Sequence, residues 1–346
     1  MRRHLNTLYV TTPDAWLHKD GENVVVKVDG KEHARVPVHI LGGIVCLGSL
    51  GATPALMGHC AERGVCISFM SRNGRFLARV EGPVSGNVLL RRGQYRFADS
   101  QEQTGLLASH IVTGKIANQR TVVRRALRDY SASSSTEWNT RLETSERRLS
   151  DAARRSAKSR DADAIRGIEG EAARIYFGAF CDLVRNDEPT FAFSGRSRRP
   201  PLDPPNALLS FLYALLVHDC RSALETVGLD PAVGYLHRER PGRPSLALDL
   251  MEELRPLVAD RLAISLINRR QLKKQDFQSE VSGAVRMRET ARKAVLVAYQ
   301  NRKKDEILHP FLEERTTIGL VPFVQANLLA RHLRGDLDAY PPFLWR

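Results

Sequence analysis

The stretch Gly82-Pro83-Val84-Ser85-Gly86-Asn87 divides the sequence into two parts with different patterns of apolar residues. Glycine, proline, serine and asparagine are typical of turns and of linkers between folded parts. A chain of 346 residues is also long enough for two domains. We therefore expect an N-terminal domain at residues 1–85 and a C-terminal domain at residues 86–346.

The part before the linker alternates short apolar runs with turn signals. Asp29-Gly30 and Asn73-Gly74 each follow an apolar run, and such dipeptides are strong hairpin signals. Residues 53–63 have the pattern of one short helix. The strands that the pattern predicts are Asn6–Val10, 24–28, 40–47 and Cys66–Met70. This part is therefore expected to fold as a small, mostly β domain with a sandwich-like arrangement.

The part after the linker has helical periodicity over most of its length. The predicted helical segments are residues 104–130, 166–185, 206–227, 245–270 and 285–307. Residues 191–205 contain four prolines and several arginines, which indicates an exposed loop. The aromatic, proline-rich end of the chain, residues 340–346, is expected to dock on its own domain. The expected fold class is thus α+β, with an N-terminal β domain and a C-terminal all-α domain.

Positive charge is concentrated in the helical part. The net charge is +13, and only +3 of it falls in residues 1–86, where 10 basic and 7 acidic residues lie. Residues 269–304 carry 11 basic and 3 acidic residues. Solvated basic helix faces are common, but so few acidic partners favour a surface that binds the phosphates of a polyanion.

Secretion and membrane insertion are poorly supported by the sequence. Charged residues interrupt the N-terminal segment before an apolar core of a signal peptide can form. The longest uncharged run, residues 36–61, is broken by glycines and prolines, so we predict no membrane span. The five cysteines include no C-x-x-C pair, which argues against a disulfide framework or a thiolate zinc site and fits the cytoplasm.

Several common catalytic signatures are absent from the sequence. It contains no P-loop, no G-x-G-x-x-G, no H-E-x-x-H and no G-x-S-x-G. What remains in the basic helical part is a set of carboxylates and one loop histidine. Oxygen ligands with a single imidazole suit Mg²⁺ or Mn²⁺, and a metal in a basic domain points to phosphodiester chemistry.

Three segments carry these groups. Glu169 lies at a helix start with glycines on both sides, and His237 lies in a loop rich in arginine. Asp249, Glu252 and Glu253 share one face of a predicted helix, where like charges repel unless a cation neutralises them. Each segment alone also has an ordinary structural interpretation: a helix-dipole carboxylate, a surface histidine and a solvated acidic face.

The order of these segments resembles one known family. They read Gly-Ile-Glu169-Gly, Asn206-Ala-Leu-Leu-Ser-Phe-Leu-Tyr213, Gly-Tyr-Leu-His237 and Ser-Leu-Ala-Leu-Asp249-Leu-Met-Glu252-Glu-Leu-Arg-Pro. Over essentially its whole length the chain resembles the CRISPR-associated endonucleases and integrases of spacer acquisition, the first-numbered Cas proteins. The late segments Leu-Ile-Asn-Arg-Arg270 and Gly-Asp-Leu-Asp-Ala-Tyr-Pro-Pro-Phe-Leu-Trp345 are most similar to the type I-C subgroup.

The resemblance implies a site for Mg²⁺ or Mn²⁺ whose ligands map to Glu169, His237 and Glu252. Asp249 matches a further acidic position beside the ligands, so the implied catalytic set is these four residues. The last ligand is Asp in some members and Glu here. Glu171 and Glu253 are outside the family pattern, although spacing alone leaves them open. Asn206 and Tyr213 are expected to order the helix behind the site.

DNA contacts are expected from an aromatic residue and from basic residues. Tyr176 matches an aromatic position near the site and is expected to position DNA. The basic residues expected to bind DNA are Arg238, Arg243, Arg269, Arg270, Lys273, Lys274, Arg292 and Lys293.

The resemblance also implies an assembly and a reaction. The β domain would form a homodimer, and a small ferredoxin-like partner, the second-numbered Cas protein, would bridge two such dimers on double-stranded DNA. The 3′-hydroxyl of a prespacer would attack a phosphodiester of the CRISPR repeat, and no nucleotide fuel or organic cofactor would be needed. Two alternatives are a DNA-binding scaffold without metal and a stand-alone metal-dependent nuclease acting on branched or single-stranded DNA.

Overall fold

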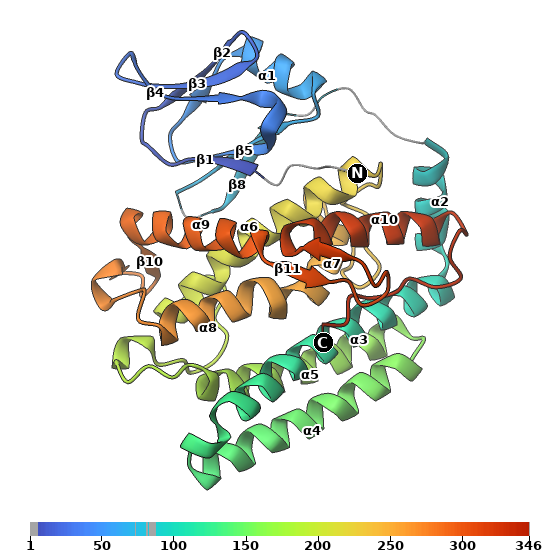
Figure 1. The fold of residues 1–346 in the computed structure, drawn as a ribbon. Coiled ribbons are helices and arrows are strands. Elements are labelled where there is room, and N and C mark those ends of the chain that lie inside the picture. Colours follow the sequence, from blue (N-terminus) through green and yellow to red (C-terminus); the bar gives the residue numbers. More distant parts are fainter. Residues whose placement is uncertain (1–5, 73, 81, 83–87, 346) are drawn as a thin grey trace. The chain divides into compact units, whose positions relative to one another are not determined.

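The computed structural model describes residues 6–72, 74–80, 82 and 88–345, and the chain forms two compact units (Figure 1). The first unit comprises Met1–Ser85 and Glu289–Lys304, and the second comprises Gly86–Arg288 and Asp305–Arg346. The helix at Glu289–Lys304, which was expected in the C-terminal domain, thus groups with the N-terminal strands. Most of the predicted linker, residues 83–87, and Asn73 of a predicted turn lie outside the described residues.

The first unit contains two four-stranded sheets. In the first sheet β1 and β5 are parallel, β5 and β7 are parallel, and β7 and β8 are antiparallel. Its strands, in spatial order, are β1 (Asn6–Val10), β5 (Leu41–Leu47), β7 (Cys66–Met70) and β8 (Phe76–Val80). In the second sheet the order is β4 (Lys31–Pro37), β3 (Asn23–Val28), β2 (Trp16–Asp20) and β6 (Gly51–Ala52).

Apolar residues from both sheets share one core with helix α1 (Pro54–Glu62). Ile44 of the first sheet, Leu17 and Val24 of the second, and Leu56 of α1 are all fully buried. The α1 helix begins after Thr53, whose side chain accepts a hydrogen bond from the Leu56 backbone N–H, as expected of an N-cap. The helix predicted at residues 53–63 is therefore confirmed, and the β character of this part follows from its hairpin signals.

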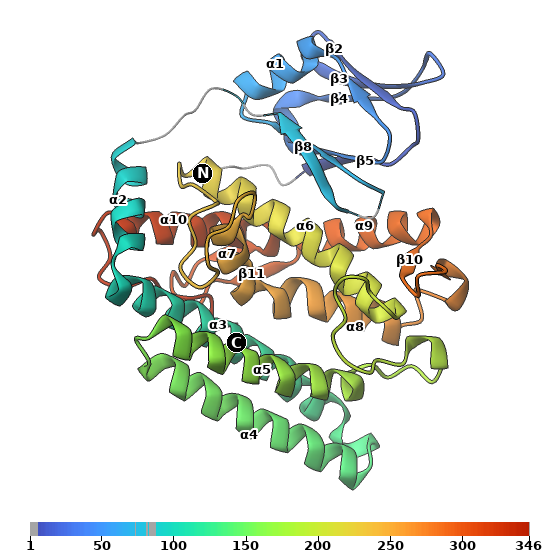
Figure 2. The same ribbon diagram turned by 180° about the vertical axis from the view of Figure 1, so that it is seen from behind.

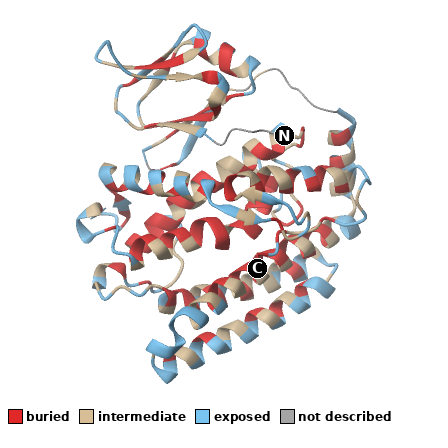
Figure 3. Cartoon of the chain, in the orientation of Figure 1, coloured by how far each residue is buried: buried red, intermediate tan, exposed pale blue. Residues whose placement is uncertain are grey.

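The second unit is mainly helical. Its helices are α2 (Val88–Asp99), α3 (Gln101–Tyr130), α4 (Thr136–Lys158), α5 (Ala162–Leu183), α6 (Pro204–Thr226), α7 (Ser245–Arg255), α8 (Arg261–Asn268) and α10 (Val321–Leu333). Helices α3, α4 and α5 lie side by side (Figure 2). Helix α3 is buried along much of its middle, whereas α4 keeps a broad exposed face (Figure 3). Because α3 also contacts α7, it connects α5 to the helix that carries the second group of acidic residues.

Two of the predicted helical segments are divided in the structure. Residues 245–270 form α7, a π-helical turn at Pro256–Asp260 and then α8. Pro256 has no backbone N–H to donate, which explains why the helix changes type there. Residues 285–307 form strand β10 (Val285–Met287), helix α9 (Glu289–Lys304) and the first residues of strand β11 (Glu306–Leu308). Strands β10 and β11 pair with β9 (Phe277–Ser279) and β12 (Arg315–Thr317) in two short antiparallel ribbons.

Two further features of the second unit bear on the sequence predictions. Helix α6 is long and apolar enough to cross a membrane, but 56% of its most apolar window is buried inside the protein, as in a core helix. The C-terminal segment docks on its own unit, as expected, with Tyr340 and Phe343 buried. The backbone N–H of Phe343 donates to Glu253, and that of Trp345 donates to Asn118 of α3.

Candidate metal and active site

Glu169 lies in the second turn of α5, and its side chain is about one-quarter exposed, at 26%. A Cβ placed at either neighbouring glycine, Gly167 or Gly170, would meet no atom within 4 Å. The glycines are therefore not required for packing. The expectation that a ligand approaches Glu169 closely stays a prediction.

Glu252 lies on α7 and is almost completely buried, with 3% of its side chain exposed. Its Oε1 is 3.0 Å from Arg255 on the same helix and 3.7 Å from His237 Nε2. Its Oε2 is 2.8 Å from Lys115 Nζ but receives no well-aligned hydrogen bond. Burial alone would raise the pKa of Glu252, but Arg255, Lys115 and His237 together lower it below the usual value.

Asp249 holds the His237 loop and orients the imidazole ring. Its buried carboxylate accepts hydrogen bonds from the backbone N–H groups of Tyr235, Leu236 and His237, at 2.6, 3.0 and 2.9 Å. The same carboxylate lies 2.7 Å from His237 Nδ1. Because a carboxylate only accepts, Nδ1 carries the proton in this hydrogen bond, and Nε2 is the ring nitrogen that faces Glu252. Asp249 thus orients the His237 ring, as carboxylates that accept a hydrogen bond from metal-binding histidines do.

Two further contacts attach the His237 loop to α5. Arg166 of α5 donates to the Leu236 carbonyl at 2.7 Å, and Arg238 pairs with Asp163 at 2.8 Å. At Gly234 a Cβ would come within 2.6 Å of Ser245 and 2.8 Å of the His237 carbonyl, so only glycine fits there. These contacts hold His237 between α5 and α7, the helices that carry Glu169 and Glu252.

The structure therefore brings the four predicted catalytic residues into one region, together with a lysine that was not predicted from the sequence. Lys115 of α3 is 4% exposed, and its Nζ contacts both Glu169 Oε1 and Glu252 Oε2. Within the described part of the chain, no group of three His, Cys, Asp or Glu side chains is spaced to hold a metal ion as it stands. The cation between the two predicted carboxylate ligands in this structure is the Lys115 ammonium group.

Spacing alone left Glu171 and Glu253 open as metal ligands, and in the structure each of them has other partners. Glu171 pairs with Arg155 of α4 at 2.7 Å. Glu253 accepts hydrogen bonds from Tyr340, from Gln325 at 3.0 Å and from the Phe343 backbone at 2.8 Å. Burial raises the pKa of Glu253 to about 7. Neither carboxylate shares the region of Glu169 and Glu252.

The predicted DNA contact of Tyr176 does not agree with its position. Tyr176 is fully buried, and its hydroxyl donates to Asp260 at 3.0 Å. Tyr213 donates to the same carboxylate at 2.6 Å, so the two tyrosines form a buried network behind the site. A hydroxyl in that position cannot touch DNA, and this corrects the prediction. The expected structural role of Tyr213, by contrast, agrees with this network.

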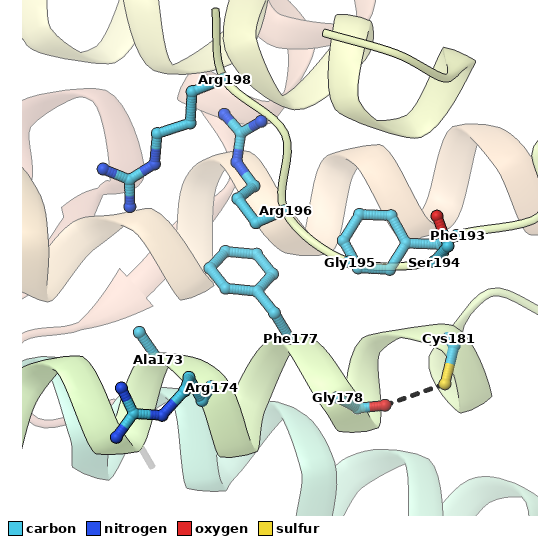
Figure 4. A pocket seen from close by; sticks show the side chains of 10 residues that line it. All are labelled: Ala173, Arg174, Phe177, Gly178, Cys181, Phe193, Ser194, Gly195, Arg196 and Arg198. Carbon is cyan, nitrogen blue, oxygen red and sulfur yellow. Dashed lines mark hydrogen bonds between the residues drawn. The ribbon is translucent and has the colours of Figure 1, made fainter.

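A pocket of about 670 Å³ opens beside α5, beginning one turn beyond Glu169 (Figure 4). Phe177 of α5 and Phe193 of the following loop lie on its wall, with ring centroids 6.2 Å apart. Three arginines also line it: Arg174, Arg196 and Arg198. The sequence pattern indicated a basic loop at residues 191–205 but gave no sign that this loop and α5 enclose a cavity.

The basic residues predicted to bind DNA lie in different parts of the chain. Arg238 is exposed, Arg243 is half-buried, and Arg269, Arg270, Lys273 and Lys274 are exposed on the second unit. Half-buried Arg292 and exposed Lys293 lie on α9 of the first unit, where Lys293 pairs with Glu289 at 2.9 Å. The run that is continuous in sequence, residues 269–304, is therefore divided between the two units.

Comparison with known proteins gives consistent matches over the chain. Residues 8–301 match the family model of CRISPR associated protein Cas1. A CRISPR-associated endonuclease Cas1 of Rhodospirillum rubrum is 57% identical, and one of Chlorobaculum tepidum is 52% identical, each covering 100% of both chains.

Two solved structures have the same fold. A CAS1 protein from Thermotoga maritima has a TM-score of 0.81 at 21% identity and covers 97% of this chain and 99% of its own. A casposase bound to integration product has a TM-score of 0.83 at 23% identity, with coverage of 98% and 94%. The arrangement of N-terminal strands followed by a helical part is therefore common to these proteins.

Proposed function

The chain belongs to the CRISPR-associated protein Cas1 family, and from this membership we propose that it is a metal-dependent DNA endonuclease and integrase. Its reaction would insert new spacers into a CRISPR array during the adaptation stage of antiviral defence. The observation that carries the proposal is that Glu169 and Glu252 contact one buried ammonium group, while His237 Nε2 lies 3.7 Å from the other oxygen of Glu252.

The residues at this position fit a divalent cation. They offer two carboxylates and one imidazole nitrogen whose tautomer Asp249 sets, a donor set that suits Mg²⁺ or Mn²⁺. Glu252 Oε2 is buried and lies 2.8 Å from the Lys115 ammonium, so a cation already lies against this oxygen. When bound, such a cation supplies Lewis-acid stabilisation of the reacting phosphate and lowers the pKa of a bound hydroxyl.

The protein residues would fix the geometry of this reaction. Asp249 holds the His237 ring, and Arg255, 12% exposed and 3.0 Å from Glu252, helps to keep that carboxylate ionised. In the proposed reaction a DNA 3′-hydroxyl oxygen bonds to phosphorus of the repeat strand. The bond from that phosphorus to the leaving 3′ oxygen breaks, and the leaving oxygen takes a proton. One phosphodiester replaces another, so no nucleotide fuel is consumed.

DNA binding is supported by positive charge near the site. The pocket beside α5 combines three arginines with two phenylalanines, groups that contact phosphates and stack on bases. The exposed basic residues Lys273 and Lys274 would add phosphate contacts that do not depend on sequence. We propose that these groups hold the strand whose end enters the site.

The assembly is proposed from the family. Residues 1–85 would mediate homodimerisation, residues 86–346 would carry the catalytic site, and a small ferredoxin-like Cas protein would bridge two dimers. One structural relative, at 24% identity, is part of a Cas6-RT-Cas1–Cas2 complex. The cytoplasm is the proposed location, where the five cysteines, none of which forms a disulfide in this structure, would stay reduced.

A stand-alone metal-dependent nuclease acting on branched or single-stranded DNA would use the same site. The two functions differ in their product, so a strand-transfer assay separates them. Labelled prespacer duplex is incubated with a plasmid that carries the cognate repeat, with Mn²⁺ and the bridging partner. The integrase predicts label covalently joined to the plasmid at the repeat, and none with Glu252→Ala. Shortened strands without joined label would identify the nuclease instead.

A further inference from the structure

Lys115 occupies a place where an isolated ammonium group is unfavourable. It lies in the middle of α3, and only 4% of its side chain is exposed. Helix neighbours Ile111, Val112 and Gln119 are buried beside it. A buried ammonium is strongly destabilising unless it is paired, and the described partners of Lys115 Nζ are Glu169 and Glu252.

These partners are the two carboxylates of the proposed metal site. Without Lys115, Glu252 would keep Arg255 as a basic neighbour, and Glu169 would lose the ammonium group that it contacts. Two carboxylates that contact the same ammonium group would repel one another without it, so a cation between them is stabilising. In this structure that cation is the Lys115 ammonium group, and the two carboxylates that it contacts are the ones that would hold the metal.

We propose that Lys115 is an internal placeholder for the metal ion. It holds Glu169 and Glu252 together in the metal-free protein and is displaced from between them when a divalent cation binds. The inference rests on the proposed metal site and adds a residue outside its ligand set. Lys115 is thus a positioning residue that competes with the metal, and its competition sets how tightly the metal is held.

Competition between Lys115 and the metal predicts a change in metal affinity that a purely structural role of Lys115 does not predict. If Lys115 only stabilised the fold, removing it would leave metal affinity unchanged or lower it. If it competes, removing its charge makes metal binding tighter, because no ammonium has to leave the carboxylates. The metal-free variant should at the same time unfold at a lower temperature, since Glu169 and Glu252 lose their shared cation.

The test is calorimetric titration of the full-length protein with Mn²⁺ in the absence of DNA. We expect Lys115→Met and Lys115→Gln to bind Mn²⁺ at least about tenfold more tightly than the wild type. Their melting temperatures in EDTA should be lower than that of the wild type, and Mn²⁺ should restore them. The matched control is Lys303→Met, which removes another buried lysine, on α9, and should leave Mn²⁺ affinity unchanged.

Unchanged or weaker Mn²⁺ binding by both Lys115 variants would overturn the proposal. Mn²⁺ binding by Glu252→Ala distinguishes failure of the Lys115 proposal from failure of the proposed metal site. If Glu252→Ala weakens binding while the Lys115 variants do not strengthen it, only the placeholder role fails. If Glu252→Ala binds Mn²⁺ as the wild type does, or if no variant binds it, the proposed metal site fails and the placeholder with it.

A second measurement needs no variant that might fail to fold. The wild type is treated with an amine-acetylating reagent in EDTA and in Mn²⁺, and modification of Lys115 is followed by peptide mass spectrometry. Displacement predicts a several-fold increase in modification with Mn²⁺, with Lys303 as the internal reference. Equal modification of Lys115 under both conditions would contradict displacement.

Discussion

Glu252 and Glu253 are consecutive residues of α7, both buried, and they lie in two regions with opposite electrostatic character. Around Glu252 the neighbours are Lys115, Arg255 and His237, and they lower its pKa despite burial. Around Glu253 the donors are the neutral groups of Tyr340, Gln325 and the Phe343 backbone, and burial raises its pKa to about 7. The surroundings of Glu252 thus favour an ionised carboxylate that can bind a cation. Those of Glu253 favour a carboxyl group that holds the C-terminal segment by hydrogen bonds.

The largest expected difference between the two regions is in catalysis. Glu252→Ala should reduce strand transfer by about a thousandfold or more, because it removes a ligand of an ion that contributes several kcal/mol to transition-state stabilisation. Glu169→Ala and His237→Ala should do the same, with duplex binding largely retained in all three. Rates come from gel-resolved product formation, and DNA affinity from fluorescence anisotropy.

Glu253→Ala is the matched variant at the next position of the helix. It should lower the free energy of unfolding by about 3 kcal/mol, because buried donors of Tyr340, Gln325 and Phe343 lose their acceptor. Strand transfer by the folded fraction should remain close to the wild-type rate. Equal loss of catalysis in Glu252→Ala and Glu253→Ala would show that the two regions do not differ in function.

A smaller effect is expected from the residue that supports a ligand. Asp249→Asn keeps the size of the side chain but replaces one acceptor oxygen with a donor next to three backbone N–H groups and His237 Nδ1. We expect strand transfer to fall by about 10–100-fold, as for other carboxylates behind metal-binding histidines. The decisive readout is Mn²⁺ affinity together with rate, and a wild-type affinity in this variant would refute the orienting role.

Asp260 is a third buried carboxyl group whose pKa is shifted by its surroundings. It faces Tyr176, Tyr213, Arg196 and Arg255, and burial raises its pKa from 3.8 to about 6. The folded protein therefore holds the Asp260 proton more tightly than the unfolded chain does. Its contribution makes the free energy of unfolding decrease as pH rises from about 4 to about 6, by up to about 3 kcal/mol in total.

Urea unfolding at a series of pH values tests this contribution. Asp260→Asn should remove that part of the pH dependence, whereas Asp151→Asn, which removes an exposed carboxyl, should not. A pH profile for Asp260→Asn that matches the wild type would show that this carboxyl titrates normally in the folded protein.

The smallest effect is expected from the exposed basic residues. Replacing Lys273 and Lys274 with Ala should weaken DNA binding and flatten its dependence on salt, by about 0.9 for each phosphate that the protein no longer neutralises. Arg292 and Lys293 should be replaced in a separate variant, because they lie in the other unit. Lys19→Ala with Lys31→Ala removes the same charge from exposed sites on the β sheets. If all three double variants have the wild-type slope, the basic run is a solvated surface.

Much of the fold could be predicted from local signals. Hairpin dipeptides and short apolar runs located β1, β3, β5 and β7, and apolar periodicity located α3, α5 and α6. Strands such as β10, of three residues, are too short for periodicity to separate them from a neighbouring helix. Helix α4 was missed because its surface is mostly exposed and polar, so its apolar stripe is narrow.

The candidate site was predictable as a set of residues but not as an arrangement. Family resemblance selected Glu169, His237, Asp249 and Glu252, whereas spacing alone did not separate Glu252 from Glu253. Lys115 was missed because its partners are 54 and 137 residues away in sequence. A signal did exist, since Lys115 is a single charge on a helix face with Ile111 and Val112. A lone lysine in such a place indicates a buried partner.

The most direct test of the proposed chemistry is disintegration of a branched half-site DNA by the purified protein. The reaction is run with Mn²⁺, with EDTA and with Glu252→Ala. Our account predicts metal-dependent release of the flap together with a rejoined, full-length strand, and neither product in EDTA or with Glu252→Ala. Release of the flap without rejoining, or rejoining by Glu252→Ala at the wild-type rate, would contradict transesterification at this site.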